Sequence, residues 1–92
     1  MNIPKLDQRI RRQPEWKQAI IRATIAALPK VRNEYDRETM VPAQIRMLLG
    51  PEKTINGSTV HSAVEKIAMI LGLERSSEAA EAGRLAREAM RQ

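Results

Sequence analysis

Apolar residues recur with the period of an α-helix along most of this 92-residue chain, and no other feature constrains its fold as strongly. The clearest series has aliphatic or small residues at spacings i, i+3, i+4 and i+7, namely Val60, Ala63, Val64, Ile67, Ile70 and Leu71. No run of alternating apolar and polar residues is long enough for a useful strand. The sequence therefore predicts an all-α fold, a compact bundle of about five helices that forms one domain over residues 1–92.

Prolines, glycines and capping residues set the ends of the predicted helices. Asn2 would cap the first helix, with Pro4 in its first turn, and Gly50-Pro51 would end the third. The helices are expected at Ile3–Arg12, Glu15 to about Arg37, Ala43–Leu49, the N-cap Ser58 to the C-cap Gly72, and the caps Ser76 and Ser77 to about Arg91.

The second of these helices has a broad apolar stripe that includes both aromatic residues of the chain. The stripe consists of Trp16, Ile20, Ile21, Ile25, Leu28, Val31 and Tyr35. Pro29 lies towards the polar side, where a proline kinks a helix without interrupting its buried face. We therefore expect one kinked helix or two nearly collinear helices, with Trp16 and Tyr35 in the core. The helix is expected to be interrupted at Met40-Val41-Pro42, before the third helix begins.

The segment between the third and fourth helices contains a strong turn dipeptide, Asn56-Gly57. Short flanking runs at residues 53–55 and 58–60 would allow a very small hairpin. A loop over Glu52–Gly57 is the preferred interpretation, because the residues from Ser58 onwards have a strong helical pattern.

Residue types that build catalytic and metal sites are scarce in this chain. It has no cysteine and a single histidine, His61, which we expect at the surface or in contact with a partner. Glu34 and Glu38 share a helix face, but the adjacent Arg37 favours a solvated charged face over a cation site. The four glycines are scattered and form no phosphate-binding loop. We expect no enzymatic activity, metal ion, cofactor or small-molecule substrate.

Membrane insertion and secretion are not expected either. No apolar run approaches the roughly 18 residues that a membrane span requires. Met1–Arg12 lacks the uninterrupted apolar stretch of a secretory signal. These observations predict a cytoplasmic protein.

The positive charge of the chain is concentrated in its N-terminal half. Residues 1–46 contain ten basic and five acidic side chains, whereas residues 47–92 contain six of each. A local excess of positive charge attracts phosphate groups, so the N-terminal half predicts a polyanion partner, with solubility as the alternative role of the charge. The residues expected to contact DNA phosphates are Arg9, Arg11, Arg12, Arg22 and Lys30.

Two consecutive segments, Gln44–Gly50 and Ser58–Val64, have the outline of a helix-turn-helix. The connection between them is about four residues longer than the usual turn of 3–4 residues. The exposed face of the second helix is nearly neutral and has no arginine to read guanine. An antiparallel helix pair with an ordinary loop is the alternative. In the helix-turn-helix interpretation the residues that approach the bases are Thr59, His61, Ser62 and Lys66.

Residues 26–35 (AALPKVRNEY), 56–60 (NGSTV) and 63–67 (AVEKI) together resemble the N-terminal part of known regulators. These are small phage-encoded late-transcription regulators of the ArpU/RinA type, which carry a Pro-marked helix, a Gly/Ser-rich loop and an AVEKI-like helix. The resemblance covers a little over half the chain. Those regulators continue into a sigma-factor-like DNA-binding region, whereas here a single Ala-rich helix follows. The resemblance therefore implies a transcription-related phage or prophage context more than it implies DNA binding.

Two functions remain open at this point. The leading hypothesis is a small, basic, helical DNA-binding regulator of transcription. The alternative is a protein-interaction or oligomerisation module, or an inhibitor, that does not bind nucleic acid. Small side chains on the last helix would let another helix approach closely, which favours a homo-oligomer such as a dimer. These residues are Ala79, Ala80, Ala82, Gly83, Ala86 and Ala89.

Overall fold

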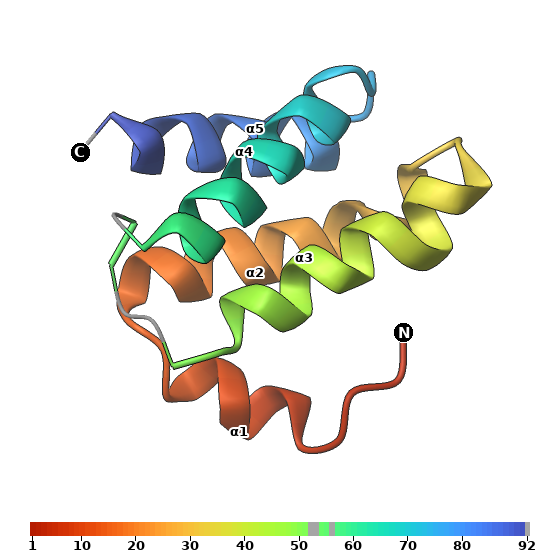
Figure 1. Ribbon diagram of the computed structural model, residues 1–92. Coiled ribbons are helices and arrows are strands. Elements are labelled where there is room, and N and C mark those ends of the chain that lie inside the picture. Colours follow the sequence, from red (N-terminus) through yellow and green to blue (C-terminus); the bar gives the residue numbers. More distant parts are fainter. Residues whose placement is uncertain (52–53, 56, 92) are drawn as a thin grey trace.

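Five α-helices and two shorter helical segments make up the computed structural model, which describes residues 1–51, 54–55 and 57–91 (Figure 1). The α-helices are α1 (Leu6–Arg11), α2 (Glu15–Ala27), α3 (Val41–Leu48), α4 (Ser58–Gly72) and α5 (Ser77–Met90). A 3-10 helix, η1 (Leu28–Lys30), follows α2, and a π-helical segment, η2 (Asp36–Met40), leads into α3. No strand occurs in the described part of the chain, and the prediction of an all-α fold is confirmed.

The helices are stacked in three levels around one apolar core. In Figure 1, α2 and α3 lie in the middle, α1 lies on one side of them, and α4 and α5 lie on the other. α4 and α5 form the most extensive contact, and α5 also packs on α2 while α4 packs on α3. The largest fully buried apolar side chains are Ile20, Ile21, Val31, Val41, Ile45, Leu48, Val60, Val64, Ile67 and Leu71. The helical periodicity therefore identified the main core positions correctly.

The small residues of α5 allow the close packing of α5 against its neighbours. Ala79, Ala82, Gly83 and Ala86 are buried, and a Cβ placed on Gly83 would lie 3.7 Å from the backbone nitrogen of Gly72 in α4. This confirms the prediction that the last helix packs by close approach. This face of α5 is already buried within the chain, so the predicted homo-oligomer would have to form through a different surface.

The prediction of one kinked helix or two nearly collinear helices from Glu15 to about Arg37 is wrong beyond Ala27, because the chain turns and α3 lies beside α2 (Figure 1). The chain tightens into η1 at Pro29 and becomes extended at Val31 (φ −74°, ψ 118°). A proline ring clashes with the carbonyl four residues earlier, so the α-helix ends here instead of kinking. A new helical segment then begins after Asn33, whose side-chain oxygen accepts a hydrogen bond from the Asp36 N–H at 3.0 Å. Asn33 thus acts as an N-cap that the sequence interpretation missed.

The expected interruption at Met40-Val41-Pro42 is also wrong, because the helix continues through Pro42. In η2 the N–H of Val41 bonds to the carbonyl of Asp36, five residues back. This wider π turn carries the helix past a residue that cannot donate a backbone hydrogen bond. Pro42 is buried near the start of α3.

Tyr35 is not a core residue, contrary to the prediction for both aromatics. Its side chain is 62% exposed, because it belongs to the new segment after Val31 and no longer follows the α2 stripe. Trp16 is half-buried and packs against the core.

The first helix begins later than predicted, at Leu6 instead of Ile3. Lys5 adopts a left-handed conformation (φ 54°) and occupies the N-cap position, so Asn2 does not cap this helix. Ile3 is buried, and the turn at Pro4 and Lys5 lets both Ile3 and Ile10 reach the core.

Two further helix ends differ from the prediction by one residue. Gly57, not Ser58, occupies the N-cap of α4, and its extended backbone is typical of that position. Gly72 is the last residue of α4 and Leu73 the C-cap. The cap predicted at Ser76 is confirmed, since its hydroxyl accepts from the Ala79 N–H at 3.1 Å. The loop expected at Glu52–Gly57 lies partly outside the described residues. Asn56 of the predicted Asn56-Gly57 turn is one of the residues outside them.

Candidate nucleic-acid interface

The last turn of α1 contains Arg9 and Arg11, and Arg12 follows as its C-cap. The carboxylate of Asp7 lies 2.7 Å from Nη2 of Arg11 and 3.5 Å from Nη2 of Arg22, so one acidic group joins α1 to α2. Arg9 and Arg12 form no ion pair with any described residue. The end of α1 therefore presents more positive charge than its single carboxylate neutralises.

Two glutamines hold this end of α1 in place. The amide of Gln13 donates to the carbonyls of Arg9 at 3.4 Å and of Leu49 at 3.3 Å. The amide of Gln18 donates to the carbonyl of Gln13 at 2.7 Å and to that of Arg11 at 3.4 Å. Because Leu49 directly follows α3, the Gln13 bond ties the α1–α2 junction to the start of the connection into α4. Sequence reasoning missed both glutamines.

Lys17 lies beneath this junction and is fully buried. Its ammonium group donates to the side-chain oxygen of Gln13 at 3.4 Å and lies 6.0 Å from the centre of the Trp16 ring. A buried cation requires partners to offset its loss of hydration. Lys17 therefore belongs to the interior of the junction and is not a phosphate-binding group.

The polar face of α4 is exposed, as the sequence analysis expected. Thr59, Ser62 and Lys66 follow one another at spacings of three and four residues and lie opposite the buried Val60 and Ile67. Lys66 forms no ion pair within the described residues.

The first turn of α4 has the electrostatic character of an anion-binding helix start. It contains no acidic residue, and no side chain of the described residues caps its N–H groups. His61 lies on this turn, with Nε2 3.5 Å from a carboxylate oxygen of Glu65. Figure 1 shows the start of α4 at the same end of the molecule as the end of α1.

Lys30 does not join this group of basic residues. It lies on η1, which contacts α5, and its charge contributes to the lowered pKa of Glu78 near the start of α5. The neighbouring Arg32 pairs with Glu74 in the α4–α5 connection at 3.1 Å. Of the five predicted phosphate ligands, Arg9, Arg11, Arg12 and Arg22 are thus grouped on α1 and α2, and Lys30 is separated from them.

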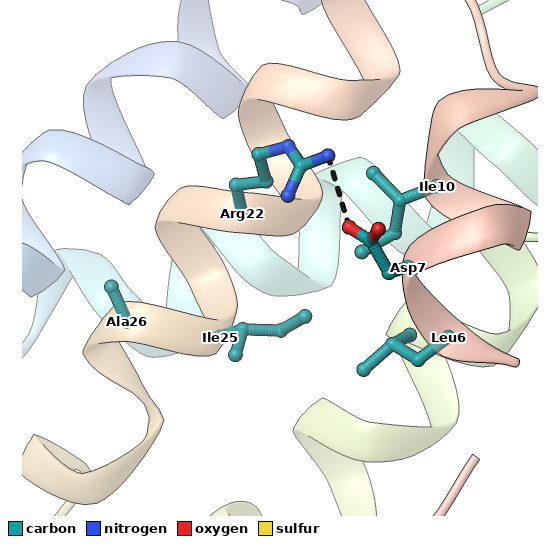
Figure 2. Close-up of a pocket in the computed structure, with 6 residues that line it drawn as sticks. All are labelled: Leu6, Asp7, Ile10, Arg22, Ile25 and Ala26. Carbon is teal, nitrogen blue, oxygen red and sulfur yellow. Dashed lines mark ion pairs between the residues drawn. The ribbon is translucent and has the colours of Figure 1, made fainter. Parts of the chain in front are cut away.

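An open hollow of about 470 Å³ lies between α1 and α2 beside the arginines. Figure 2 shows Leu6 and Ile25 pointing towards each other across it, with the ion pair between Asp7 and Arg22 along one edge. α1 therefore rests on α2 through a small number of side chains, with Ile10 as its buried anchor. The ion pair and the Gln13 bonds supply the remaining attachment.

Glu78, Glu81 and Arg84 of α5 have displaced pKa values, and they lie away from the arginine cluster, which consists of Arg9, Arg11, Arg12 and Arg22. A hydrogen bond from its own backbone N–H and another from the Ser77 hydroxyl lower the pKa of Glu78. Hydrogen bonds from Arg84 lower the pKa of Glu81, and the same carboxylate together with Glu88 raises the pKa of Arg84. These groups stabilise the surface of α5 and do not form a reactive centre.

The described part of the chain contains no group of three or more His, Cys, Asp or Glu residues placed to hold a metal ion. None of its helices is sufficiently long and apolar to span a membrane. No protein-family model, curated protein or solved structure matches this chain.

Proposed function

We propose that this chain is a small helical DNA-binding regulator of transcription, and that its DNA contact combines the end of α1 with the start of α4. The observation that carries this proposal is the hydrogen bond from Gln13 to the carbonyl of Leu49 at 3.3 Å. It fixes the arginine-rich end of α1 against the connection into α4, so that both basic and polar groups are available at one end of the molecule.

The residues of this interface have different roles. Arg9 and Arg12 contact phosphates directly, and Arg11 and Arg22 add to the positive field although both share Asp7. The N–H groups at the start of α4 bind a further phosphate. Thr59 and Ser62 approach the base edges. His61 and Lys66 flank them on the exposed face of α4.

The proposed interface favours affinity over sequence discrimination. Nine residues separate α3 from α4, more than the 3–4 residues of a standard helix-turn-helix, so in this proposal α4 is the recognition helix of a helix-turn-helix with a lengthened turn. No arginine is exposed on α4 to read guanine bidentately. We therefore propose a regulator in which phosphate contacts dominate, acting in the cytoplasm in a phage or prophage context.

Fluorescence anisotropy with a duplex DNA at two salt concentrations tests the proposal. We expect binding that weakens steeply with salt, since each phosphate contact releases a counterion. The double variant Arg9→Gln/Arg12→Gln should bind at least tenfold more weakly and reduce the slope of log K against log salt by roughly 2.

Lys30→Gln provides a matched control, because it removes a positive charge that lies beside α5 instead of at the interface. Its affinity should fall less than twofold. Equal losses in Lys30→Gln and Arg12→Gln would contradict a localised interface and indicate a response to net charge alone. Absence of binding at low salt would favour the alternative function, a protein-interaction module.

A further inference from the structure

The hollow between α1 and α2 has mostly apolar walls and adjoins the arginines of the proposed DNA interface. Its volume of about 470 Å³ lies within the range of about 300–1,000 Å³ that is usual for small-molecule sites. Figure 2 shows Leu6 of α1 and Ile25 of α2 pointing towards each other across it. The lining residues are Leu6, Asp7, Ile10, Arg22, Ile25 and Ala26. Four of these six are apolar, so the hollow suits the apolar part of a ligand.

The charged edge of the hollow includes an arginine with unused hydrogen-bond donors. Asp7 lies 2.7 Å from Nη2 of Arg11, and its contact with Nη2 of Arg22 is longer, at 3.5 Å. Within the described part of the chain, that long contact is the one polar interaction of the Arg22 side chain. A guanidinium has five N–H donors, so Arg22 can still bind an anionic group.

The size of the hollow favours a small molecule over a helix of another protein. The lining residues run from Leu6 to Ile10 on α1 and from Arg22 to Ala26 on α2, so each wall rises by four residues, or about 6 Å. A helix that binds in a groove places its anchors at positions i, i+3 or i+4 and i+7, which extend over about 10 Å. These walls are too short for such a row of anchors.

The balance of charge at this edge selects the sign of the ligand. Arg11 and Arg22 share one carboxylate, that of Asp7, so the edge has an excess of one positive charge. A cationic ligand would be repelled by this excess, and an uncharged ligand would leave the donors of Arg22 unused. An anion with an apolar tail complements both the charged edge and the apolar walls.

We propose that this hollow binds a small amphiphilic anion, with an aliphatic tail between Leu6 and Ile25 and a carboxylate on the guanidinium of Arg22. The bound anion neutralises Arg22 and adds negative charge beside Arg11, so it competes with DNA phosphates. The competition rests on the proposed DNA-binding function, whereas the ligand site does not.

Calorimetric titration with octanoate tests the site in the absence of DNA. We expect saturable binding of one octanoate per chain at concentrations below those at which octanoate forms micelles. Acetate lacks the tail and octylammonium has the opposite charge, so neither should bind measurably. Absence of octanoate binding, binding that begins only with micelle formation, or equal binding of octanoate and octylammonium would overturn the proposal.

Two charge variants at the edge of the hollow should have opposite effects. Arg22→Gln should weaken octanoate binding about tenfold, because a charge-assisted hydrogen bond is lost. Asp7→Asn should tighten it, since the carboxylate that competes for Arg22 is removed. Arg75→Gln removes an exposed positive charge from the α4–α5 connection and should change the affinity less than about twofold. Equal losses in Arg22→Gln and Arg75→Gln would indicate a response to net charge and overturn the assigned site.

A variant that fills the hollow separates ligand binding from charge. Ala26→Leu enlarges an exposed residue that lines the hollow and should weaken octanoate binding several-fold. Ala80→Leu, at an exposed position of α5, is the matched control and should bind octanoate as the original chain does. Equal affinity of Ala26→Leu and the original chain would show that the ligand does not enter the hollow.

Fluorescence anisotropy with duplex DNA tests the competition. Saturating octanoate should weaken DNA binding by the original chain, relative to acetate at the same concentration, and should have less effect on Ala26→Leu. DNA binding that octanoate leaves unchanged would refute the competition. Octanoate binding by a chain that does not bind DNA would support the ligand site and refute the proposed function, so the two failures are distinguishable.

Discussion

Gly83 of α5 faces the backbone of Gly72 at the end of α4, where a Cβ on Gly83 would lie 3.7 Å from the Gly72 nitrogen. The guanidinium of Arg87 covers the same site, 3.3 Å from that Cβ position. This close approach sets the separation of the two helices that make the most extensive contact in the fold.

Gly83→Ala should be tolerated and should raise the free energy of unfolding by about 0.5–1 kcal/mol, because alanine favours the helix and only the flexible end of Arg87 must move. Gly83→Leu should lower it by about 1–3 kcal/mol, since a large side chain forces α4 and α5 apart. Urea denaturation measures both changes. Ala80→Leu, at an exposed position of α5, is the control and should change stability by less than about 0.5 kcal/mol.

Thr24 is fully buried in α2, and its hydroxyl makes no hydrogen bond with the described part of the chain. Thr24→Val keeps the shape of the side chain and removes this unsatisfied group, so we expect the free energy of unfolding to rise by about 1 kcal/mol. Thr24→Ser keeps the hydroxyl and loses a methyl group, and should lower it by about 1 kcal/mol. Opposite signs in thermal denaturation would support this explanation, and a loss of stability in Thr24→Val would refute it.

Ser76 caps α5 by accepting a hydrogen bond from the Ala79 N–H at 3.1 Å. Ser76→Ala should lower the free energy of unfolding by about 1 kcal/mol, because a helix N–H loses its partner. Ser77→Ala is the adjacent control and should cost only a few tenths of a kcal/mol, since the Ser77 hydroxyl contacts an exposed carboxylate. Equal losses at the two positions would argue against a capping role that is specific to Ser76.

The carboxylates of Glu78 and Glu81 have pKa values below the ordinary 4.5 in the folded chain. The unfolded chain therefore binds more protons near and below this pH, and the contribution of these groups to stability is lost as the pH falls through their folded pKa values. Glu78→Gln/Glu81→Gln should flatten the decline of the melting temperature between about pH 5 and 3. Parallel pH profiles of the variant and the original chain in that window would contradict this expectation.

Asp7 is the single carboxylate shared by Arg11 and Arg22. Asp7→Asn releases both guanidinium groups, and under the proposed function it should tighten DNA binding several-fold at low salt and steepen the salt dependence. Stability should change by less than about 1 kcal/mol, because all three side chains are largely exposed. Unchanged or weaker binding in a folded variant would show that Arg11 and Arg22 do not contribute to the interface.

The helical pattern predicted the buried residues of α4 and the close packing of α5 against a neighbouring helix. Both depend only on which residue types recur at helical spacing along the sequence. Val60, Val64 and Ile67 are buried as expected, and so are Ala79, Ala82, Ala86 and Ala89 of α5, whereas Ala80 is exposed. Tyr35 was misplaced because its helical phase was extrapolated through Pro29, where the α-helix ends. Asn33, followed three residues later by Asp36, had the pattern of a helix start and would have corrected this assignment.

The candidate interface was predictable in composition but not in arrangement. Arg9, Arg11 and Arg12 are neighbours in sequence, so their grouping on one short helix required no tertiary information. The bond between Gln13 and Leu49 joins residues 36 positions apart, and no local pattern encodes it. Lys30 was assigned with the arginines because of its charge, whereas the break after Ala27 directs it towards α5.

The π-helical turn at Asp36–Met40 has a consequence for how this protein can diverge in evolution. Such a turn contains one residue more than an α-helical turn, so removal of a single residue there would leave a continuous helix. The deletion would rotate Tyr35 and Asp36 by about 100° relative to α3. Related proteins that are one residue shorter in this turn would therefore be expected to keep the core and the arginine cluster but to present a different surface to other molecules.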